Sequence, residues 1–304
     1  MGTPDFAVPG LLALVKSSHE VVCVVTTQDK PAGRGLRLQT SAVKRAALEA
    51  SCPVLQPDNL RDDGFLLGLK SYQPDLMVVV AFRILPSEVF TIPPRGTLNL
   101  HASLLPKYRG AAPIQWALIN GEKETGVTTF FIEEKVDTGR VIMQRRIAID
   151  PEMNAGELHD ALAAAGAEVL LETVDAISAG ICRTAEQQGE ATLAPKITRE
   201  LCRIDWERPA VDIHNLVRAL APVPGAVTRW RNTILKILAS RLAAGSGTGE
   251  PGRILAAAKD GAMHVQTGRG VLSIYRIQPE GKRPMLAGEY LAGHRALLGD
   301  HFIF

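Results

Sequence analysis

The stretch LNLHASLLPKYRGAAPIQWAL, residues 98–118, contains the end of a buried strand, a turn and a basic segment in immediate succession. The apolar alternation from Thr97 to His101 is typical of a strand. Side chains alternate along a strand with a period of two, so Asn99 and His101 share one face. In open α/β sheets, ligands bind at the carboxyl ends of the strands. The stretch therefore predicts an α/β fold with a ligand site at the end of this strand.

Strand and helix patterns alternate through residue 180. The strand candidates are Val21–Thr26, Leu76–Phe82, Thr97–His101, Gly126–Ile132 and Val141–Ile147. Helical spacing of apolar residues occurs in Pro9–Ser17, Ser41–Ala50, Leu60–Leu69, Ala111–Asn120 and Glu157–Ile177. This order predicts a Rossmann-like, mostly parallel sheet wrapped by helices.

The pattern changes beyond Gly189. One helical stretch, Asp212–Leu220, is followed by short strand candidates separated by turns: Ala226–Arg231, Ile234–Ala239, Arg253–Ala257, His264–Thr267 and Val271–Ile277. Such spacing is typical of a small antiparallel β-barrel, here of the OB-like kind. We therefore expect a catalytic domain over residues 1–189, a linker over 190–203 and a C-terminal OB-like domain over 204–304.

The chain begins, at Met1-Gly2-Thr3-Pro4, with what resembles the turn after a first strand. Open α/β sheets usually start with a buried strand that leads into the first helix. We therefore expect the first strand of the catalytic domain to be truncated.

The composition is that of a folded protein outside the membrane. Of 304 residues, 46% are apolar and 22% are charged. The longest apolar run, Leu76–Phe82, is too short to span a bilayer, and the first twenty residues lack the basic start of a secretory signal. We expect a cytoplasmic protein without a membrane partner. The four cysteines, at 23, 52, 182 and 202, have the spacing of neither a metal site nor a disulfide framework.

The charge is distributed unevenly along the chain. Residues 194–304 contain 16 Lys and Arg against 9 Asp and Glu, whereas residues 1–193 contain 18 against 23. A basic C-terminal part favours a polyanionic partner. A basic surface that is merely solvated explains the same numbers.

Asn99 and His101 have side chains suited to acyl transfer. An amide and an imidazole on one face can stabilise the oxyanion that forms when a carbonyl carbon is attacked. Asp137, in the loop Lys135–Gly139, is the candidate that orients the imidazole and accepts a proton. No Cys or Ser lies in a nucleophile elbow, so we expect direct attack by the substrate. Taken singly, a lone His is more often a packing residue, and an Asp before Thr-Gly is usually a turn former.

The ordered motif from Asn99 to Gly110, followed by Thr125–Thr128 and Asp137-Thr138-Gly139, resembles the formyltransferase family that uses 10-formyltetrahydrofolate. The resemblance implies that Asn99, His101 and Asp137 form the catalytic trio. It also implies a folate cosubstrate and no metal. The folate-binding residues would be Phe82, Arg83, Ile84, Leu85, Ser103, Leu104, Leu105 and Pro106.

Further segments resemble the methionyl-tRNA branch of that family: Met1–Pro9, Gly110–Trp116, Pro195-Lys196-Ile197 and Ile204-Asp205-Trp206. This resemblance implies transfer of the formyl group to the α-amine of methionyl initiator tRNA, by direct amine attack, for translation initiation. We expect a monomer. Asp137 would help to remove the amine proton, orient His101 and favour its protonated form.

A basic loop leading into a helix is the candidate contact with the tRNA acceptor end. Its basic residues, with no acid between 30 and 45, are Lys30, Arg34, Arg37, Lys44 and Arg45. Phosphates attract such cations, and an unpaired RNA end can be splayed. The alternative is a solvated loop. Cations of the C-terminal domain that could contact the tRNA backbone include Lys196, Arg199, Arg229, Arg231, Lys236, Lys282 and Arg283.

Three alternative functions differ from formyl transfer to methionyl-tRNA in the acceptor or in the chemistry. A sugar-nucleotide N-formyltransferase would use the same site on another amine. A non-catalytic RNA-binding homologue is disfavoured because all three catalytic residues are present. A glycinamide ribonucleotide transformylase is disfavoured because Thr3-Pro4-Asp5 lacks a phosphate-binding loop: proline removes a backbone donor, and aspartate repels phosphate.

Overall fold

The computed structural model describes residues 1–32, 37–244, 249–257, 261–294 and 300–303. Contacts divide the chain into two compact units. The first comprises Met1–Gly110, Glu124–Ala148 and His159–Ala194. The second comprises Ala111–Lys123, Ile149–Leu158 and Pro195–Phe304. The domain limits expected from the sequence, at residues 189 and 204, stay a prediction.

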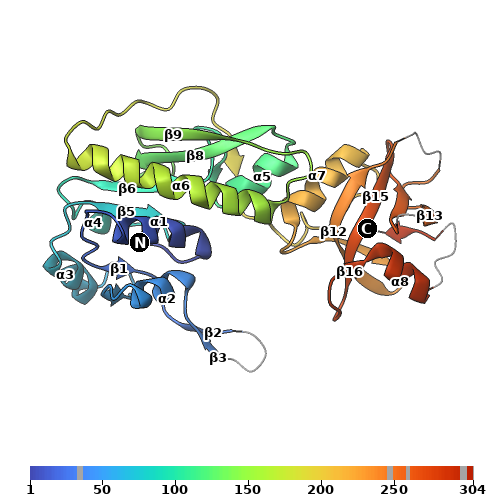
Figure 1. Cartoon of the computed structure of the whole chain (residues 1–304), viewed down its shortest axis with the longest axis horizontal. Coiled ribbons are helices and arrows are strands. Elements are labelled where there is room, and N and C mark those ends of the chain that lie inside the picture. Colours follow the sequence, from blue (N-terminus) through green and yellow to red (C-terminus); the bar gives the residue numbers. More distant parts are fainter. Residues whose placement is uncertain (33–36, 245–248, 258–260, 295–299, 304) are drawn as a thin grey trace. The chain divides into compact units, whose positions relative to one another are not determined.

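A four-stranded sheet forms the centre of the first unit (Figure 1). Its strands, in spatial order, are β5 (Met77–Val80), β6 (Thr97–His101), β8 (Glu124–Phe131) and β9 (Val141–Ala148). β5 and β6 are parallel, whereas β8 pairs antiparallel with both β6 and β9. A second parallel pair joins β1 (Val24–Val25) to β4 (Val54–Leu55). The predicted α/β class is confirmed, with an antiparallel part at one side of the sheet.

Four helices of the first unit begin and end close to their predicted limits. They are α1 (Val8–Val15), α2 (Ala42–Glu49), α3 (Asp63–Ser71) and α6 (Ala155–Ser178), most of which lies in this unit. Two short helices, η1 (Asp5–Ala7) and α4 (Ser87–Phe90), were not predicted. Ser41 and Asp62 cap α2 and α3 by accepting hydrogen bonds from the main chain. Helix α6 runs along the sheet in Figure 1, and Gly166 permits close packing, since an added Cβ would lie 2.9 Å from Leu100.

A hairpin replaces the loop expected around residues 30–40. Strand β2 (Lys30–Ala32) pairs antiparallel with β3 (Arg37–Gln39), and α2 follows. Figure 1 shows the hairpin projecting beyond α2. Each strand has only three residues and Pro31 lies in one, so the sequence lacks the alternation that predicts a hairpin.

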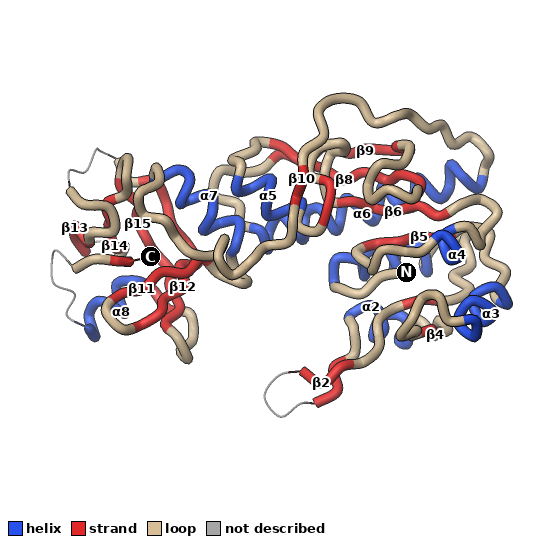
Figure 2. The backbone as a smooth tube through the Cα atoms, turned by 180° about the vertical axis from the view of Figure 1, so that it is seen from behind, coloured by secondary structure: helices blue, strands red, loops and turns tan. Residues whose placement is uncertain are grey.

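The second unit contains an antiparallel sheet that is nearly closed into a barrel (Figure 2). Its strands are β11 (Ala226–Trp230), β12 (Thr233–Leu242), β13 (Ile254–Ala257), β14 (Met263–Gln266), β15 (Val271–Pro279), β16 (Met285–Leu286) and β17 (Phe302–Ile303). A bridge between Arg253 and His301 joins the β13 and β17 sides. The unit also contains α5 (Pro113–Ile119), α7 (Ala210–Leu220) and α8 (Ala287–His294). The predicted barrel-like domain is confirmed.

The apolar core of the barrel includes Ile204, Trp206, Leu235, Ile237 and Leu272. Trp206 and Phe302 stack with their ring centroids 5.3 Å apart. Within the described parts of the chain, no helix is both long and apolar enough to cross a bilayer.

Candidate active site

The middle of the first sheet presents Asn99 and His101 on one face of β6. The alternate residues, Leu98 and Leu100, are 0% and 3% exposed on the other face. Because β6 pairs with β5 on one side and β8 on the other, its main chain is held along both edges. Asn99 is half-buried, and its side chain hydrogen bonds with no described residue. Its amide is therefore available to a ligand.

His101 is buried, and both of its ring nitrogens face polar atoms. Nε2 lies 2.8 Å from the carbonyl oxygen of Tyr108. A carbonyl only accepts, so Nε2 carries the hydrogen and donates it. Nδ1 lies 3.8 Å from Oδ2 of Asp137. That distance allows an electrostatic interaction but exceeds that of a hydrogen bond, so Nδ1 keeps a free bonding position.

The Asp137 carboxylate is held in place by the main-chain nitrogen of Gly110. Its side chain is 10% exposed. Oδ2 accepts a hydrogen bond of 2.9 Å from the Gly110 nitrogen, whereas no hydrogen bond from a described residue reaches Oδ1. Asp137 has a φ of +56°, in the left-handed region that aspartate adopts more readily than most residues. The strained loop therefore fixes a carboxylate with one oxygen available beside His101.

The turn after β6 is locked by side-chain hydrogen bonds. Ser103 Oγ donates to Lys107 O at 2.6 Å. Thr128 Oγ1 donates to Ser103 O at 2.6 Å and accepts from Leu105 N at 3.1 Å. The bond from Leu105 to Pro106 is cis. The predicted folate-binding turn therefore has a fixed shape, although part of its main chain already bonds within the protein.

Residues 82–85, which follow β5, have main-chain groups that are available to a ligand. The N–H and C=O groups of residues 82–85 hydrogen bond with no described residue. Leu85 is buried, while Ile84 is 76% exposed. Free main-chain donors and acceptors next to apolar side chains suit a planar heterocycle with polar edges.

Arg83 is used within the protein. Its guanidinium donates to the carbonyl oxygens of Asp58 at 2.7 Å and Pro57 at 2.8 Å. It also lies 5.4 Å from the centroid of the Phe82 ring. The side chain of Arg83 therefore supports the shape of the segment, and its main chain is the part left for a ligand.

The predicted tRNA-binding cations have different environments. Lys30 belongs to β2 and Arg37 to β3. Lys44 forms an ion pair of 2.6 Å with Asp29, and its side chain is only 18% exposed. Arg45 donates to Thr40 O at 2.8 Å. Arg34 lies outside the described residues.

Two residues near the site, Thr192 and Gln187, were not predicted from the sequence. Thr192 lies in the predicted linker and Gln187 lies just before it, and they contact Tyr108, Arg109 and the Asp137 loop. Thr192 accepts a hydrogen bond from Tyr108 N through Oγ1 and another from Arg109 N through its carbonyl, both of 2.9 Å. Strand β7 (Arg109–Gly110) then pairs with β10 (Leu193–Ala194). Gln187 donates to main-chain oxygens of the Asp137 loop. These contacts join residues about 50 to 84 positions apart, and no local pattern announces them.

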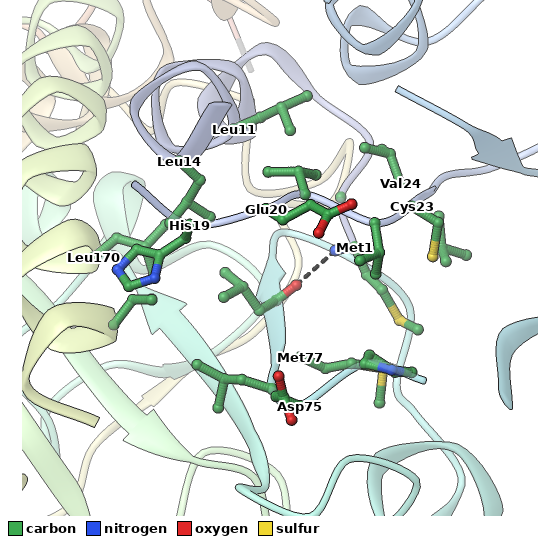
Figure 3. Close-up of a pocket in the computed structure, with 18 of the residues that line it drawn as sticks. Met1, Leu11, Leu14, His19, Glu20, Cys23, Val24, Asp75, Met77 and Leu170 are labelled. Carbon is green, nitrogen blue, oxygen red and sulfur yellow. Dashed lines mark hydrogen bonds between the residues drawn. The ribbon is translucent and has the colours of Figure 1, made fainter. Parts of the chain in front are cut away.

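A cavity of about 330 Å³ lies elsewhere in the first unit (Figure 3). Its lining comes from the start of the chain and from α1, β1, β5 and α6, and includes Met1, Cys23, Val24 and Met77. Among the lining residues, Met1 N donates to Val78 O at 2.6 Å. Neither Asn99, His101 nor Asp137 lines this cavity, so the chemistry we assign to β6 does not depend on it.

The described residues contain no group of three or more His, Cys, Asp or Glu side chains that could hold a metal ion.

Two family models match this chain. The model of the formyl transferase family matches residues 1–174, and that of the formyl transferase C-terminal domain matches residues 196–295. The methionyl-tRNA formyltransferase of Thermodesulfovibrio yellowstonii is 45% identical over 295 residues, covering 97% of this chain and 94% of that protein. The methionyl-tRNA formyltransferase of Moorella thermoacetica is 46% identical over 302 residues, covering 99% and 97%.

Solved structures share the fold at lower identity. The sugar 3N-formyl transferase WlaRD, crystallised in the presence of dTDP and 5-N-formyl-THF, matches with a TM-score of 0.65 at 20% identity. The match covers 93% of this chain and 97% of that chain. At this identity the likeness concerns the fold alone.

Proposed function

The chain belongs to the formyl transferase family, among the methionyl-tRNA formyltransferases, and we propose that Asn99, His101 and Asp137 are its catalytic residues. The enzyme transfers a formyl group to the amine of methionyl-tRNA. The observation that carries the residue assignment is the 3.8 Å approach of His101 Nδ1 to Asp137 Oδ2, on the strand that also presents Asn99.

The proposed reaction is direct attack of the α-amine on the formyl carbon. The amine must be neutral, and the formyl oxygen acquires negative charge as the tetrahedral intermediate forms. The Asn99 amide and the protonated Nδ1 of His101 donate to that oxygen, because neither is committed to a hydrogen bond within the protein. Asp137 Oδ1 accepts the amine proton, directly or through water. Collapse of the tetrahedral intermediate then breaks the bond between the formyl carbon and the nitrogen of its donor, and that nitrogen takes up the proton as the deformylated donor leaves.

The proposed formyl donor is 10-formyltetrahydrofolate, without a metal. The open main chain of residues 82–85 supports its placement there, next to the turn Ser103–Pro106. The donor and acceptor edges of a pteridine would pair with those free N–H and C=O groups. The formyl group would then face the Asn99 side of β6.

The proposed acceptor is initiator methionyl-tRNA, bound by a monomer in the cytoplasm. Residues 30–45 would contact the acceptor end through Lys30, Arg34, Arg37, Lys44 and Arg45. Residues 204–304 would bind the tRNA backbone through the positive charge of the C-terminal part, in which 16 basic residues outnumber 9 acidic ones from 194 to 304.

The function is tested by incubating the protein with 10-formyltetrahydrofolate and either methionyl initiator tRNA or an amino-sugar nucleotide. We expect formylmethionyl-tRNA and no formylated sugar. Formylation of the sugar nucleotide alone would contradict the proposal and would point to the alternative acceptor. His101→Ala serves as the chemical control, because it should abolish product while tRNA binding persists.

A further inference from the structure

We propose that Gln187 is a positioning residue for catalysis, which holds the Asp137 carboxylate beside His101 through the main chain of the Asp137 loop. The inference rests on the proposed function, since it assigns Gln187 a role in the reaction through Asp137. Gln187 lies about 50 residues from Asp137 in sequence, between the long helix α6 and strand β10.

Gln187 joins both ends of the short segment that carries the carboxylate. Its Nε2 donates to the carbonyl oxygen of Asp137 at 2.9 Å and to that of Gly139 at 3.0 Å. A single amide group has two N–H donors, and both are used on this segment. The distance between those two carbonyl oxygens is therefore set by one rigid group.

The orientation of the Gln187 amide is itself determined. Arg109 donates to Oε1 from Nη2 at 2.7 Å and from Nε at 3.2 Å. Arginine has no acceptor, so the atom facing it must be the amide oxygen, and the nitrogen must face the two carbonyls. The arginine charge also polarises the amide and strengthens the hydrogen bonds that its N–H groups donate.

The Asp137 loop needs such support because its conformation is costly. Asp137 has a φ of +56°, and left-handed backbone persists in non-glycine residues only where the surroundings enforce it. Two residues later, the main chain of Gly139 passes so close to Phe131 O that an added Cβ would overlap it. A main chain held in that shape presents Oδ2 to Gly110 N at 2.9 Å and to His101 Nδ1 at 3.8 Å.

Both groups that fix the Asp137 loop depend on strand β7, because Arg109 and Gly110 are adjacent. Gly110 N donates to the Asp137 carboxylate. Arg109 donates to the Gln187 amide, which in turn donates to the carbonyl oxygens of Asp137 and Gly139. Small displacements of a catalytic group reduce rates strongly, by about a hundredfold for an error of about 1 Å. Gln187 is therefore expected to affect the chemical step rather than substrate binding.

The test compares Gln187→Leu with Gln188→Leu. Gln188 is the next residue, is exposed and hydrogen bonds with no described residue, which makes it a matched control. We expect Gln187→Leu to reduce the single-turnover rate of formyl transfer about 10- to 100-fold, with KM for both substrates changed less than about twofold. Gln188→Leu should leave the rate unchanged. Equal rates for Gln187→Leu and the unaltered enzyme would overturn the proposal.

Two further variants separate positioning from folding and from the role of Asp137. Gln187→Glu keeps an acceptor for Arg109 but loses both donors to the carbonyls, so it should also be slow. Its thermal unfolding curve is recorded with the kinetics, so that the slower rate is measured at a temperature at which the variant is folded. In an Asp137→Asn background, adding Gln187→Leu should reduce the rate less than about twofold further, because the group that it positions is already lost. An undiminished further loss would overturn the proposal. Full activity of Asp137→Asn would instead refute the proposed function, and Gln187 would lose its role with it.

Discussion

Asn99 and His101 lie two residues apart on one strand but differ in how their hydrogen-bonding groups are used. His101 commits Nε2 to Tyr108 O at 2.8 Å, whereas the Asn99 amide bonds with no described residue. The imidazole is thereby oriented by the protein, and the amide can be oriented only by the substrate. In the proposed reaction, Asn99 therefore contributes to catalysis without a large contribution to the free energy of unfolding.

We predict that Asn99→Ala reduces kcat about 100- to 1000-fold, which is the usual loss for one oxyanion donor. The free energy of unfolding should change little, because no internal hydrogen bond of the side chain is lost. Steady-state kinetics and a thermal unfolding curve check both parts. Asn99→Asp, with nearly the same shape but no donor and an added negative charge, should be at least as slow.

The sequence predicts the shared face of Asn99 and His101 because strand periodicity is local. It also indicates Asp137 through its loop. The contacts of Tyr108 O and Gly110 N with these side chains are not predictable from the sequence, since they depend on left-handed φ angles of +61° at Tyr108 and +56° at Asp137. The role of Gln187 is likewise not predictable from the sequence, because its partners, Arg109 and the Asp137 loop, are distant from it along the chain.

At the scale of elements, the loop between β8 and β9 packs so tightly at Gly139 that there is no room for a side chain. We predict that Gly139→Ala destabilises the protein by about 1–3 kcal/mol, because an added Cβ would overlap Phe131 O. Formyl transfer should also slow, since the loop carries Asp137. Chemical denaturation and single-turnover kinetics measure the two effects.

Gly68, within helix α3, provides the matched control for this substitution. No atom lies within 4 Å of a Cβ added there. Gly68→Ala should therefore stabilise the protein by about 0.5–1 kcal/mol through reduced backbone freedom of the unfolded chain. A Gly139→Ala protein as stable and active as Gly68→Ala would show that the loop has no tight packing.

The β2–β3 hairpin gives a separate prediction about tRNA. Arg37→Ala should raise KM for methionyl-tRNA and reduce the slope of log K against log salt by about 0.7–0.9, the contribution of one phosphate contact. Arg61→Ala is the control, because Arg61 pairs with Glu88 on an exposed surface at 3.3 Å. An unchanged salt slope for Arg37→Ala would refute the assignment of the hairpin.

Long, periodic elements are the ones that the sequence predicts well. Strand β6 matches its predicted range, and β8, β9 and α6 differ by no more than two residues at each end. The pairing of β7 with β10 is not predictable, because each strand has two residues and 82 residues separate their ends. Such short strands are stabilised by their surroundings and have no intrinsic pattern.

For the molecule as a whole, the start of the chain couples stability to pH. Burial lowers the pKa of the Met1 ammonium from 8.0 to about 6. Between these values the unfolded chain binds more protons than the folded chain, so stability rises with pH and is lower at and below pH 6. A chain whose first residue is Met1 should therefore gain about 2 kcal/mol of unfolding free energy between pH 6 and pH 8.

Denaturant titrations at the two pH values measure this gain. Acetylation of the Met1 nitrogen removes the titrating group, so the acetylated protein should lose that part of the pH dependence. The same rise in both forms would assign it to other groups. The sequence alone cannot predict this effect, because it arises from the position of Met1 between the carbonyl of Val78 and the cavity beside β5.

In the proposed reaction, Asp137, beside His101, takes part in transfer of the formyl group to methionyl-tRNA. The most direct test is the single-turnover rate of Asp137→Asn at saturating 10-formyltetrahydrofolate and methionyl initiator tRNA. We predict a rate reduced by about 100-fold or more, with tRNA affinity unchanged, because the amide cannot accept the amine proton or support a protonated His101. A rate equal to that of the unaltered enzyme would show that Asp137 has no part in the chemical step.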